Sequence, residues 1–107
     1  KNKEKGRRTL ADELDTVPAT LPALMRAQKL QKRAAGRGLG VTTAEDAAAA
    51  LKRAEQDWDA APAPSAEQAG ELLFAAVNAI RLAGLDAEEA LTFASKRFRD
   101  ELLADQT

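Results

Sequence analysis

Apolar residues recur at three- and four-residue intervals along four stretches of the chain, which is the period of an amphipathic α-helix. β-branched residues are few and nowhere alternate with polar ones, so the sequence predicts no strand. The predicted helices cover residues 21–35, 43–61 and 66–83 and the segment from 87 onward.

Residues that begin and end helices stand at the borders of these stretches. A side-chain oxygen at the cap, followed three residues later by Glu or Gln, satisfies backbone N–H groups that would otherwise be unpaired. Such pairs are Thr42 with Glu45, Ser65 with Gln68, and Asp86 with Glu89. Pro62 and Pro64 end the second helix, and Gly84 is placed to cap the C-terminus of the third.

The sequence predicts one helical domain preceded by an arm. Residues 1–18 lack sustained periodicity and are predicted to be a linker or an arm lying on the domain. Residues 19–107 are predicted to form an all-α four-helix bundle. Because the chain begins with Lys1, we expect a further domain upstream in the same polypeptide. The fourth helix is predicted to bury Ala90, Leu91, Ala94, Phe98 and Leu102.

The third helix carries a polar stripe on an otherwise apolar surface. Gln68, Glu71 and Asn78 follow the spacing of one helix face, with Ala75 between them. A buried carboxylate needs a partner, because an unpaired one costs several kcal/mol. Glu71 is therefore expected either to form an ion pair with the first helix or to hold a cation together with acidic residues of the second.

The chain contains neither cysteine nor histidine, which excludes disulfides, zinc sites and serine-histidine catalysis. Any metal must be held by oxygen ligands, which suit Mg²⁺ or Mn²⁺. The missing cysteine fits a cytoplasmic protein, and no apolar run is long enough to span a membrane. Residues 1–40 carry ten Lys and Arg against four Asp and Glu, whereas residues 41–107 carry six against thirteen. Either the two halves attract each other on folding, or basic groups lie beside an acidic, cation-dependent anion site.

Residues 21–34 read Leu-Pro-Ala-Leu-Met-Arg-Ala-Gln-Lys-Leu-Gln-Lys-Arg-Ala, and residues 67–78 read Glu-Gln-Ala-Gly-Glu-Leu-Leu-Phe-Ala-Ala-Val-Asn. These two segments resemble the MazG-type nucleoside triphosphate pyrophosphohydrolases, in particular the second of the two copies that some members carry. The first segment resembles the helix that opens such a domain, and the second resembles its metal-binding helix. The Lys-Asn-Lys-Glu-Lys start also agrees, so the resemblance covers nearly the whole chain.

The resemblance implies hydrolysis of nucleoside triphosphates to monophosphate and pyrophosphate, with Mg²⁺ held by a Glu-Glu-x-x-Glu helix and a Glu-x-x-Asp helix. Here the second motif reads Gln68-x-x-Glu71, and the first falls on residues 53–57, where Asp57 is the remaining carboxylate. A slipped register would use Glu55 and Asp59 instead. The implied metal ligands are thus Glu71, Asp57, Glu55, Gln68 and Asp59, with Glu71 and Asp57 as catalytic candidates.

The resemblance also implies substrate-binding positions. In a later segment the family's Lys has become Arg97, and two of its arginines have become Asp100 and Glu101. The substrate candidates are Arg26, Lys29, Gln31, Asn78, Arg81 and Arg97.

Two functions stay open at this point. One is a Mg²⁺-dependent pyrophosphohydrolase domain with a partly degraded metal site, and the other is a noncatalytic copy that serves dimerisation or regulation of a longer protein. We expect a homodimer formed through the second and third helices, because exposed apolar faces generally mark interfaces. Nucleic-acid binding is not expected, since the basic arm lacks interleaved aromatic residues.

Overall fold

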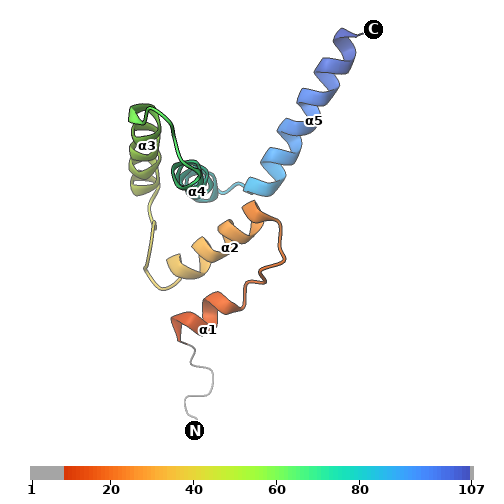
Figure 1. Cartoon of the computed structure of the whole chain (residues 1–107). Coiled ribbons are helices and arrows are strands. Elements are labelled where there is room, and N and C mark those ends of the chain that lie inside the picture. Colours follow the sequence, from red (N-terminus) through yellow and green to blue (C-terminus); the bar gives the residue numbers. More distant parts are fainter. Residues whose placement is uncertain (1–8, 107) are drawn as a thin grey trace.

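The computed structural model describes residues 9–106, and all regular structure in that part of the chain is α-helical. This confirms the all-α prediction. Five helices follow one another along the chain (Figure 1): α1 Leu10–Asp15, α2 Ala23–Ala35, α3 Ala44–Ala60, α4 Ala66–Leu82 and α5 Ala87–Asp105. The prediction of four helices is therefore wrong in number. Residues 1–8, the greater part of the basic start, lie outside the described residues.

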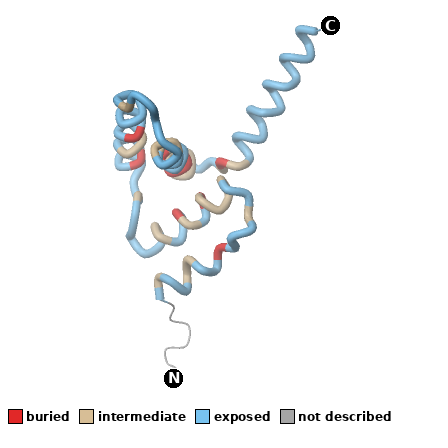
Figure 2. Tube along the Cα trace, viewed as in Figure 1, coloured by how far each residue is buried: buried red, intermediate tan, exposed pale blue. Residues whose placement is uncertain are grey.

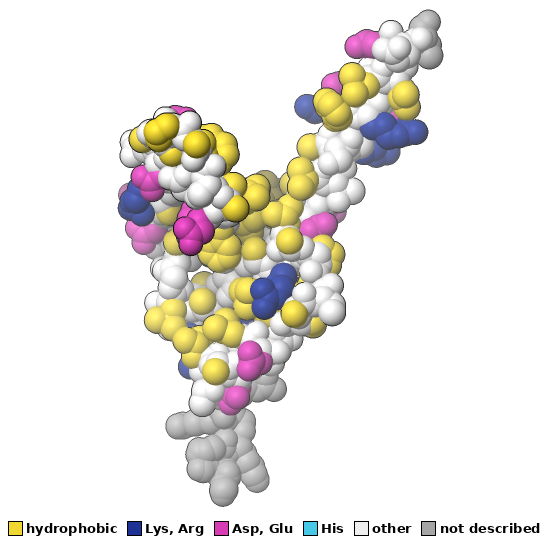
Figure 3. All heavy atoms as spheres, in the orientation of Figure 1, with side chains coloured by type: hydrophobic (Ala, Val, Ile, Leu, Met, Phe, Trp, Pro, Cys, Tyr) yellow, Lys and Arg dark blue, Asp and Glu magenta, His cyan; other side chains and the backbone are white. Residues whose placement is uncertain are grey.

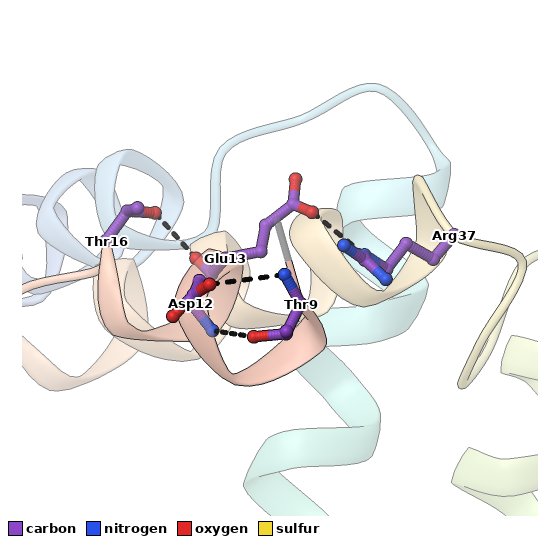
Figure 4. A network of polar contacts seen from close by, with 5 residues as sticks. All are labelled: Thr9, Asp12, Glu13, Thr16 and Arg37. Atoms are coloured by element: carbon purple, nitrogen blue, oxygen red, sulfur yellow. Dashed lines mark hydrogen bonds and ion pairs between the residues drawn. The ribbon is translucent and has the colours of Figure 1, made fainter. Parts of the chain in front are cut away.

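The additional helix, α1, forms within the predicted arm. Thr9 and Asp12 make a reciprocal capping box, with Asp12 N–H donating to Thr9 Oγ1 at 3.0 Å (Figure 4). Arg37, which follows α2, donates to Glu13 Oε1 at 2.9 Å and ties α1 to the body of the protein. A six-residue helix makes fewer than two turns, which is too short to show apolar periodicity, so the sequence pattern did not reveal it.

Helix α4 lies at the centre of the fold. It packs most extensively against α3 and also contacts α2 and α5. Several small side chains are buried here, among them Ala47 and Ala54 of α3 and Ala75 of α4. Small residues let helix axes approach closely, so α3 and α4 form a tight pair joined by the short segment that contains Pro62 and Pro64.

Most helix ends agree with the sequence prediction. Ser65 and Gln68 form the expected reciprocal capping box, and Asp86 caps α5 by accepting from Glu89 N–H. Gly84 has φ +82° after α4, a backbone conformation that favours glycine. The start of α3 is displaced by one residue, because Thr43 rather than Thr42 is the cap and its hydroxyl accepts from Asp46 N–H.

Helix α5 extends away from the other helices (Figure 1). Ala87 is buried where α5 begins, but every residue from 89 to 106 is exposed (Figure 2). The predicted burial of the fourth-helix face is therefore wrong: Leu91, Phe98 and Leu102 are 54%, 66% and 50% exposed, and Ala90 and Ala94 are exposed as well. The reason is that α5 contacts α2 and α4 only near its start, and no element of the described chain covers the rest.

The projection of α5 makes the molecule elongated rather than a closed bundle. Its principal extents are 67 × 34 × 24 Å and its radius of gyration is 17.4 Å, against about 13 Å for a compact domain of roughly 100 residues. None of the helices in residues 9–106 combines the length and hydropathy needed to cross a membrane.

Candidate functional site

A pocket of about 300 Å³ opens between α3 and α4. We call it the carboxylate pocket, because Asp57 of α3 and Glu71 of α4 both line it. Arg53 lies one helical turn before Asp57 and faces the same space, and Asn78 lies two turns after Glu71. The full lining is Val41, Ala50, Arg53, Ala54, Asp57, Glu71, Phe74, Ala75 and Asn78.

Both carboxylates of this pocket are exposed, and neither forms an ion pair with another residue in the 9–106 range. The expectation that Glu71 is buried is therefore wrong. The buried part of this face begins one turn later, at Ala75 and Asn78, whereas Glu71 lies near the start of α4 and is exposed. A solvated carboxylate has little desolvation to compensate, so Glu71 does not need the predicted ion pair with α2.

The structure brings Asp57, and not the slipped-register residues, to the side of Glu71. Glu55 and Asp59 are exposed on α3 and do not line the pocket, because two residues along a helix amount to a rotation of about 200°. Gln68 does not line it either. Its Oε1 accepts from Ser65 N–H at 2.9 Å, so the side chain caps α4.

How well a hard cation fits the carboxylate pocket depends on the oxygen ligands that its side chains supply. Within residues 9–106 no group of three or more acidic side chains lies close enough to hold a metal ion. Asp57 and Glu71 alone supply two carboxylates, and Arg53 adds a positive charge to the same lining. Such a pair suits Mg²⁺ that arrives with phosphate oxygens as further ligands, since Mg²⁺ is commonly held by one or two carboxylates plus substrate phosphates.

Three of the predicted substrate residues form one hydrogen-bonded network. Arg81 Nη2 donates to Asn78 Oδ1 at 2.8 Å and to the carbonyl oxygen of Val41 at 2.8 Å. Arg81 Nε donates to Gln31 Oε1 at 3.4 Å, and Gln31 Nε2 donates to the carbonyl oxygen of Phe74 at 3.0 Å. Burial lowers the pKa of Arg81, but a guanidinium stays charged at neutral pH. The network fixes two buried amides, those of Gln31 and Asn78, beside the carboxylate pocket.

A second pocket adjoins the first. It measures about 320 Å³ and is lined almost wholly by apolar side chains, so we call it the apolar pocket. Val41, Phe74 and Asn78 line both pockets, which makes the two continuous at these residues. The full lining is Leu14, Leu30, Gln31, Ala34, Gly40, Val41, Phe74 and Asn78.

The remaining predicted substrate residues lie elsewhere. Arg26 and Lys29 of α2 line neither pocket, and the buried Nε of Arg26 has no partner in the described part of the chain. Arg97 lies on the exposed half of α5, where its Nε is 3.7 Å from Glu101 Oε2. The structure thus joins Gln31, Asn78 and Arg81 but does not bring these three basic residues to them.

Sequence reasoning missed one residue of the apolar pocket and one buried polar residue that lines neither pocket. Leu14 comes from the predicted arm and forms part of the apolar pocket. Gln28 is buried and joins α2 to the start of α5, since its Nε2 donates to Asp86 Oδ1 at 2.8 Å and its Oε1 accepts from Ala87 N–H at 2.7 Å. The available signal was the pair of glutamines, Gln28 and Gln31, three residues apart within an apolar helix face.

Comparison with known proteins identifies proteins that are similar to the chain in sequence. No protein-family model matches it. Two curated proteins, each named nucleoside triphosphate pyrophosphohydrolase, are 39% identical to it over 106 residues: one from Escherichia coli strain K12 and one from Escherichia coli O157:H7. The alignment covers 92% of this chain but 40% of each relative. Over most of its length the chain is thus similar to part of these MazG-type pyrophosphohydrolases.

This identity confirms the resemblance that the two sequence segments indicated. The MazG-like chain spans less than half the length of the curated relatives that it matches. Its carboxylate pocket lies between the two helices that carry the acidic positions implied by the resemblance, α3 with Asp57 and α4 with Glu71.

Proposed function

We propose that this chain is a nucleotide-binding domain of the MazG-type pyrophosphohydrolases that converts nucleoside triphosphates to monophosphate and pyrophosphate only slowly. The observation that carries the proposal is the junction of the two pockets. Exposed carboxylates on one side, Asp57 and Glu71, adjoin an apolar pocket bordered by the Gln31 and Asn78 amides. A nucleoside triphosphate likewise has a charged end, the triphosphate, and a largely apolar end, the base. Its two ends could therefore occupy the two adjoining pockets.

Mg²⁺ or Mn²⁺ is the cofactor that this donor set favours, with Asp57 and Glu71 as its protein ligands. When bound, the cation would neutralise the triphosphate and polarise its oxygens. We expect the metal alone to bind weakly, because two exposed carboxylates beside a cationic Arg53 attract it less than a larger acidic cluster does. Slow turnover follows, since a cation held by few ligands is poorly positioned.

The test is pyrophosphate release from a panel of nucleoside triphosphates with Mg²⁺ and with Mn²⁺, paired with calorimetric binding of the same nucleotides. We expect binding, with turnover far below the roughly 10 s⁻¹ typical of enzymes. Asp57→Asn and Glu71→Gln should each weaken metal-dependent binding. Glu55→Gln makes the same kind of exchange outside the pocket and should not. Turnover near one per second would refute the slow-enzyme proposal, and absence of binding to every triphosphate would refute nucleotide binding itself.

A second candidate function is noncatalytic self-association, and the surface of α4 and α5 favours it. Of the ten exposed large apolar residues between 9 and 106, eight lie on or between these two helices, and apolar side chains gather there in Figure 3. We therefore propose that a homodimer forms through α4 and α5, in place of the interface through the second and third predicted helices. We further propose that the domain acts in the cytoplasm beside an upstream domain of the same polypeptide.

A further inference from the structure

Helix α2 carries basic side chains and no acidic ones. Its 13 residues include Arg26, Lys29, Lys32 and Arg33 but neither Asp nor Glu, in a chain whose net charge is −1. Lys32 and Arg33 follow Lys29 by three and four residues, so these three exposed cations lie close together on one side of the helix. Like charges at such spacings repel each other, so this side of α2 holds a local excess of positive charge.

The three cations form no ion pair with a carboxylate in residues 9–106. The basic residues of α5, by contrast, pair with acidic side chains of their own helix: Lys96 and Arg99 with Asp100, and Arg97 with Glu101. The positive charge of α5 is thus balanced within the helix, whereas that of α2 is not.

Asp86, the N-cap of α5, is influenced by two of these charges but does not neutralise them. Its pKa is lowered chiefly by the hydrogen bonds from Glu89 N–H and Gln28, and to a smaller extent by the charges of Lys32 and Lys29. Its two carboxylate oxygens already accept those hydrogen bonds, at 2.7 and 2.8 Å. The positive charge of α2 therefore stays accessible to a ligand.

The same cations border a hollow of about 410 Å³, which we call the basic hollow. Glu13 of α1 and Arg37 also line it and pair with each other at 2.9 Å (Figure 4). With that pair balanced, the remaining charge of the lining is +3, from Lys29, Lys32 and Arg33. The hollow thus offers a small anion several positive charges at once.

Gly36 completes the lining of the hollow, although its backbone does not require glycine. Its φ is −62°, which every residue type adopts. A Cβ there would lie 3.5 Å from the carbonyl oxygens of Lys32 and Arg33, which is an ordinary contact. The absence of a side chain at Gly36 therefore leaves space for a ligand without serving the fold.

The basic hollow and the apolar pocket lie on opposite faces of α2. The apolar pocket uses Leu30, Gln31 and Ala34 of this helix, each rotated away from the basic side by the 3.6-residue turn. The basic hollow shares no lining residue with the apolar pocket or with the carboxylate pocket. A ligand in the hollow is therefore not the ligand of the carboxylate pocket.

We propose that the basic hollow binds a linear polyphosphate group, the chemistry shared by inorganic tripolyphosphate and the phosphate chain of a nucleotide. Such an anion relieves the repulsion among the three cations. The guanidinium of Arg33 can donate two parallel hydrogen bonds to one phosphate, and Lys29 and Lys32 supply point charges. Because the protein itself supplies the positive charge, binding needs no metal. The inference does not rest on the proposed function.

A nucleic-acid strand fits the basic hollow less well than a small polyphosphate does. Strands are usually held by a basic groove that follows the backbone together with aromatic rings that stack on the bases. The lining of the hollow contains no aromatic side chain, and its three unpaired cations occupy about one turn of helix.

The test is calorimetric titration of the chain with inorganic tripolyphosphate in EDTA at low salt. Without a divalent cation, the carboxylates of Asp57 and Glu71 repel phosphate, so the carboxylate pocket does not contribute. We expect one anion to bind per chain, more weakly as NaCl is raised, because salt screens exposed charges. Amide NMR shifts should locate the anion at residues 29–37. Absence of binding at low salt overturns the inference.

Two double variants with equal charge changes assign the site. Lys32→Gln with Arg33→Gln removes two of the three cations and should weaken tripolyphosphate binding by about tenfold or more. Lys96→Gln with Arg99→Gln removes the same two kinds of charge from α5, outside the hollow, and should leave the affinity nearly unchanged. All four positions are exposed and Gln is a good helix former, so both variants should fold. Equal losses in the two variants would show that the anion responds only to overall charge, which overturns the site.

Further titrations in EDTA identify the source of the polyphosphate group. Adenosine triphosphate that binds as tightly as tripolyphosphate would show that the hollow recognises phosphate alone, and much tighter binding would identify a nucleotide as the source. Either result supports the shared chemistry if the α2 double variant loses it. A single-stranded oligonucleotide that binds far more tightly than tripolyphosphate, and through the same residues, overturns the small-anion assignment.

The requirement for metal separates this inference from the proposed function. Triphosphates that bind only with Mg²⁺ or Mn²⁺, while no anion binds in EDTA, would leave the proposed function standing and refute the basic hollow. Tripolyphosphate that binds in EDTA, while added metal promotes no triphosphate binding, would support the hollow and refute the proposed function.

Discussion

Arg53 is the residue that most distinguishes the carboxylate pocket from a site built for a divalent cation. It lines the pocket with Asp57 and Glu71, and its charge opposes that of an approaching cation. Replacing it by a neutral residue should therefore strengthen cation binding. We predict that Arg53→Gln raises Mg²⁺ and Mn²⁺ affinity by about 1 kcal/mol, or roughly fivefold, in calorimetric titration.

A charge-matched control is available on α4. Gln68→Glu changes the net charge by the same amount, but the Gln68 side chain caps the helix through Ser65 and does not line the pocket. Glu serves equally well at that cap position, so this variant should fold normally and change metal affinity little. An increase as large as that of Arg53→Gln would show that the two substitutions act only through overall charge.

Asp86 links the stability of the protein to pH. The N–H of Glu89, and next the amide of Gln28, hold the pKa of Asp86 below its ordinary value of 3.8. A lowered folded pKa means that this contribution to stability is present above the ordinary value and is lost as pH falls through the folded value. Melting temperatures between about pH 5 and pH 2 should therefore fall less for Asp86→Asn, which keeps a capping oxygen, than for wild type. Asp105→Asn, at the exposed end of α5, should melt like wild type across this range.

Helix α5 exposes more large apolar side chains than any other helix of the described chain. Phe93, Phe98 and Leu102 are 71%, 66% and 50% exposed, although residues of this kind usually bury in an interface or a core. We predict that the double substitution Phe98→Ser and Leu102→Ser leaves the fold intact and abolishes self-association in sedimentation or light scattering.

The polar residues of the same helix supply the control. Lys96→Ser removes an exposed side chain whose ion pair with Asp100 contributes little, so it should leave self-association unchanged. Wild-type protein that remains strictly monomeric at tens of micromolar would refute the α5 interface.

At the scale of the whole molecule, the core is small. The buried apolar residues between 9 and 106 are Val17, Ala47, Ala54, Ala75, Val77 and Ala87, and no large side chain there is fully buried. Removing apolar area from water is the main favourable term in folding, so a lone chain with so few buried large side chains gains little from it.

Association would add the missing burial and make stability depend on concentration. We predict that the melting temperature rises by roughly 5 °C or more over a hundredfold increase in protein concentration. The α5 double variant should melt at a lower temperature that does not change with concentration. A concentration-independent melting temperature for wild type would show that the single chain holds its own fold.

Local sequence determined the helices and most of their ends. The Ser65 to Gln68 capping box, the Asp86 cap and the turn at Gly84 each depend on groups within a few residues of one another, so short-range spacing suffices to predict them. The exception, α1, was too short to leave a periodic pattern.

Tertiary structure alone decided which side chains share a site. Asp57 and Glu55 are equivalent acidic residues on one helix, and only the side of α3 that packs on α4 selects Asp57. Leu14 reaches the apolar pocket because α1 packs on α2, and Gln28 meets Asp86 across 58 residues of chain. The rotation and placement of whole helices follow from the summed packing of many distant residues, which no local pattern encodes.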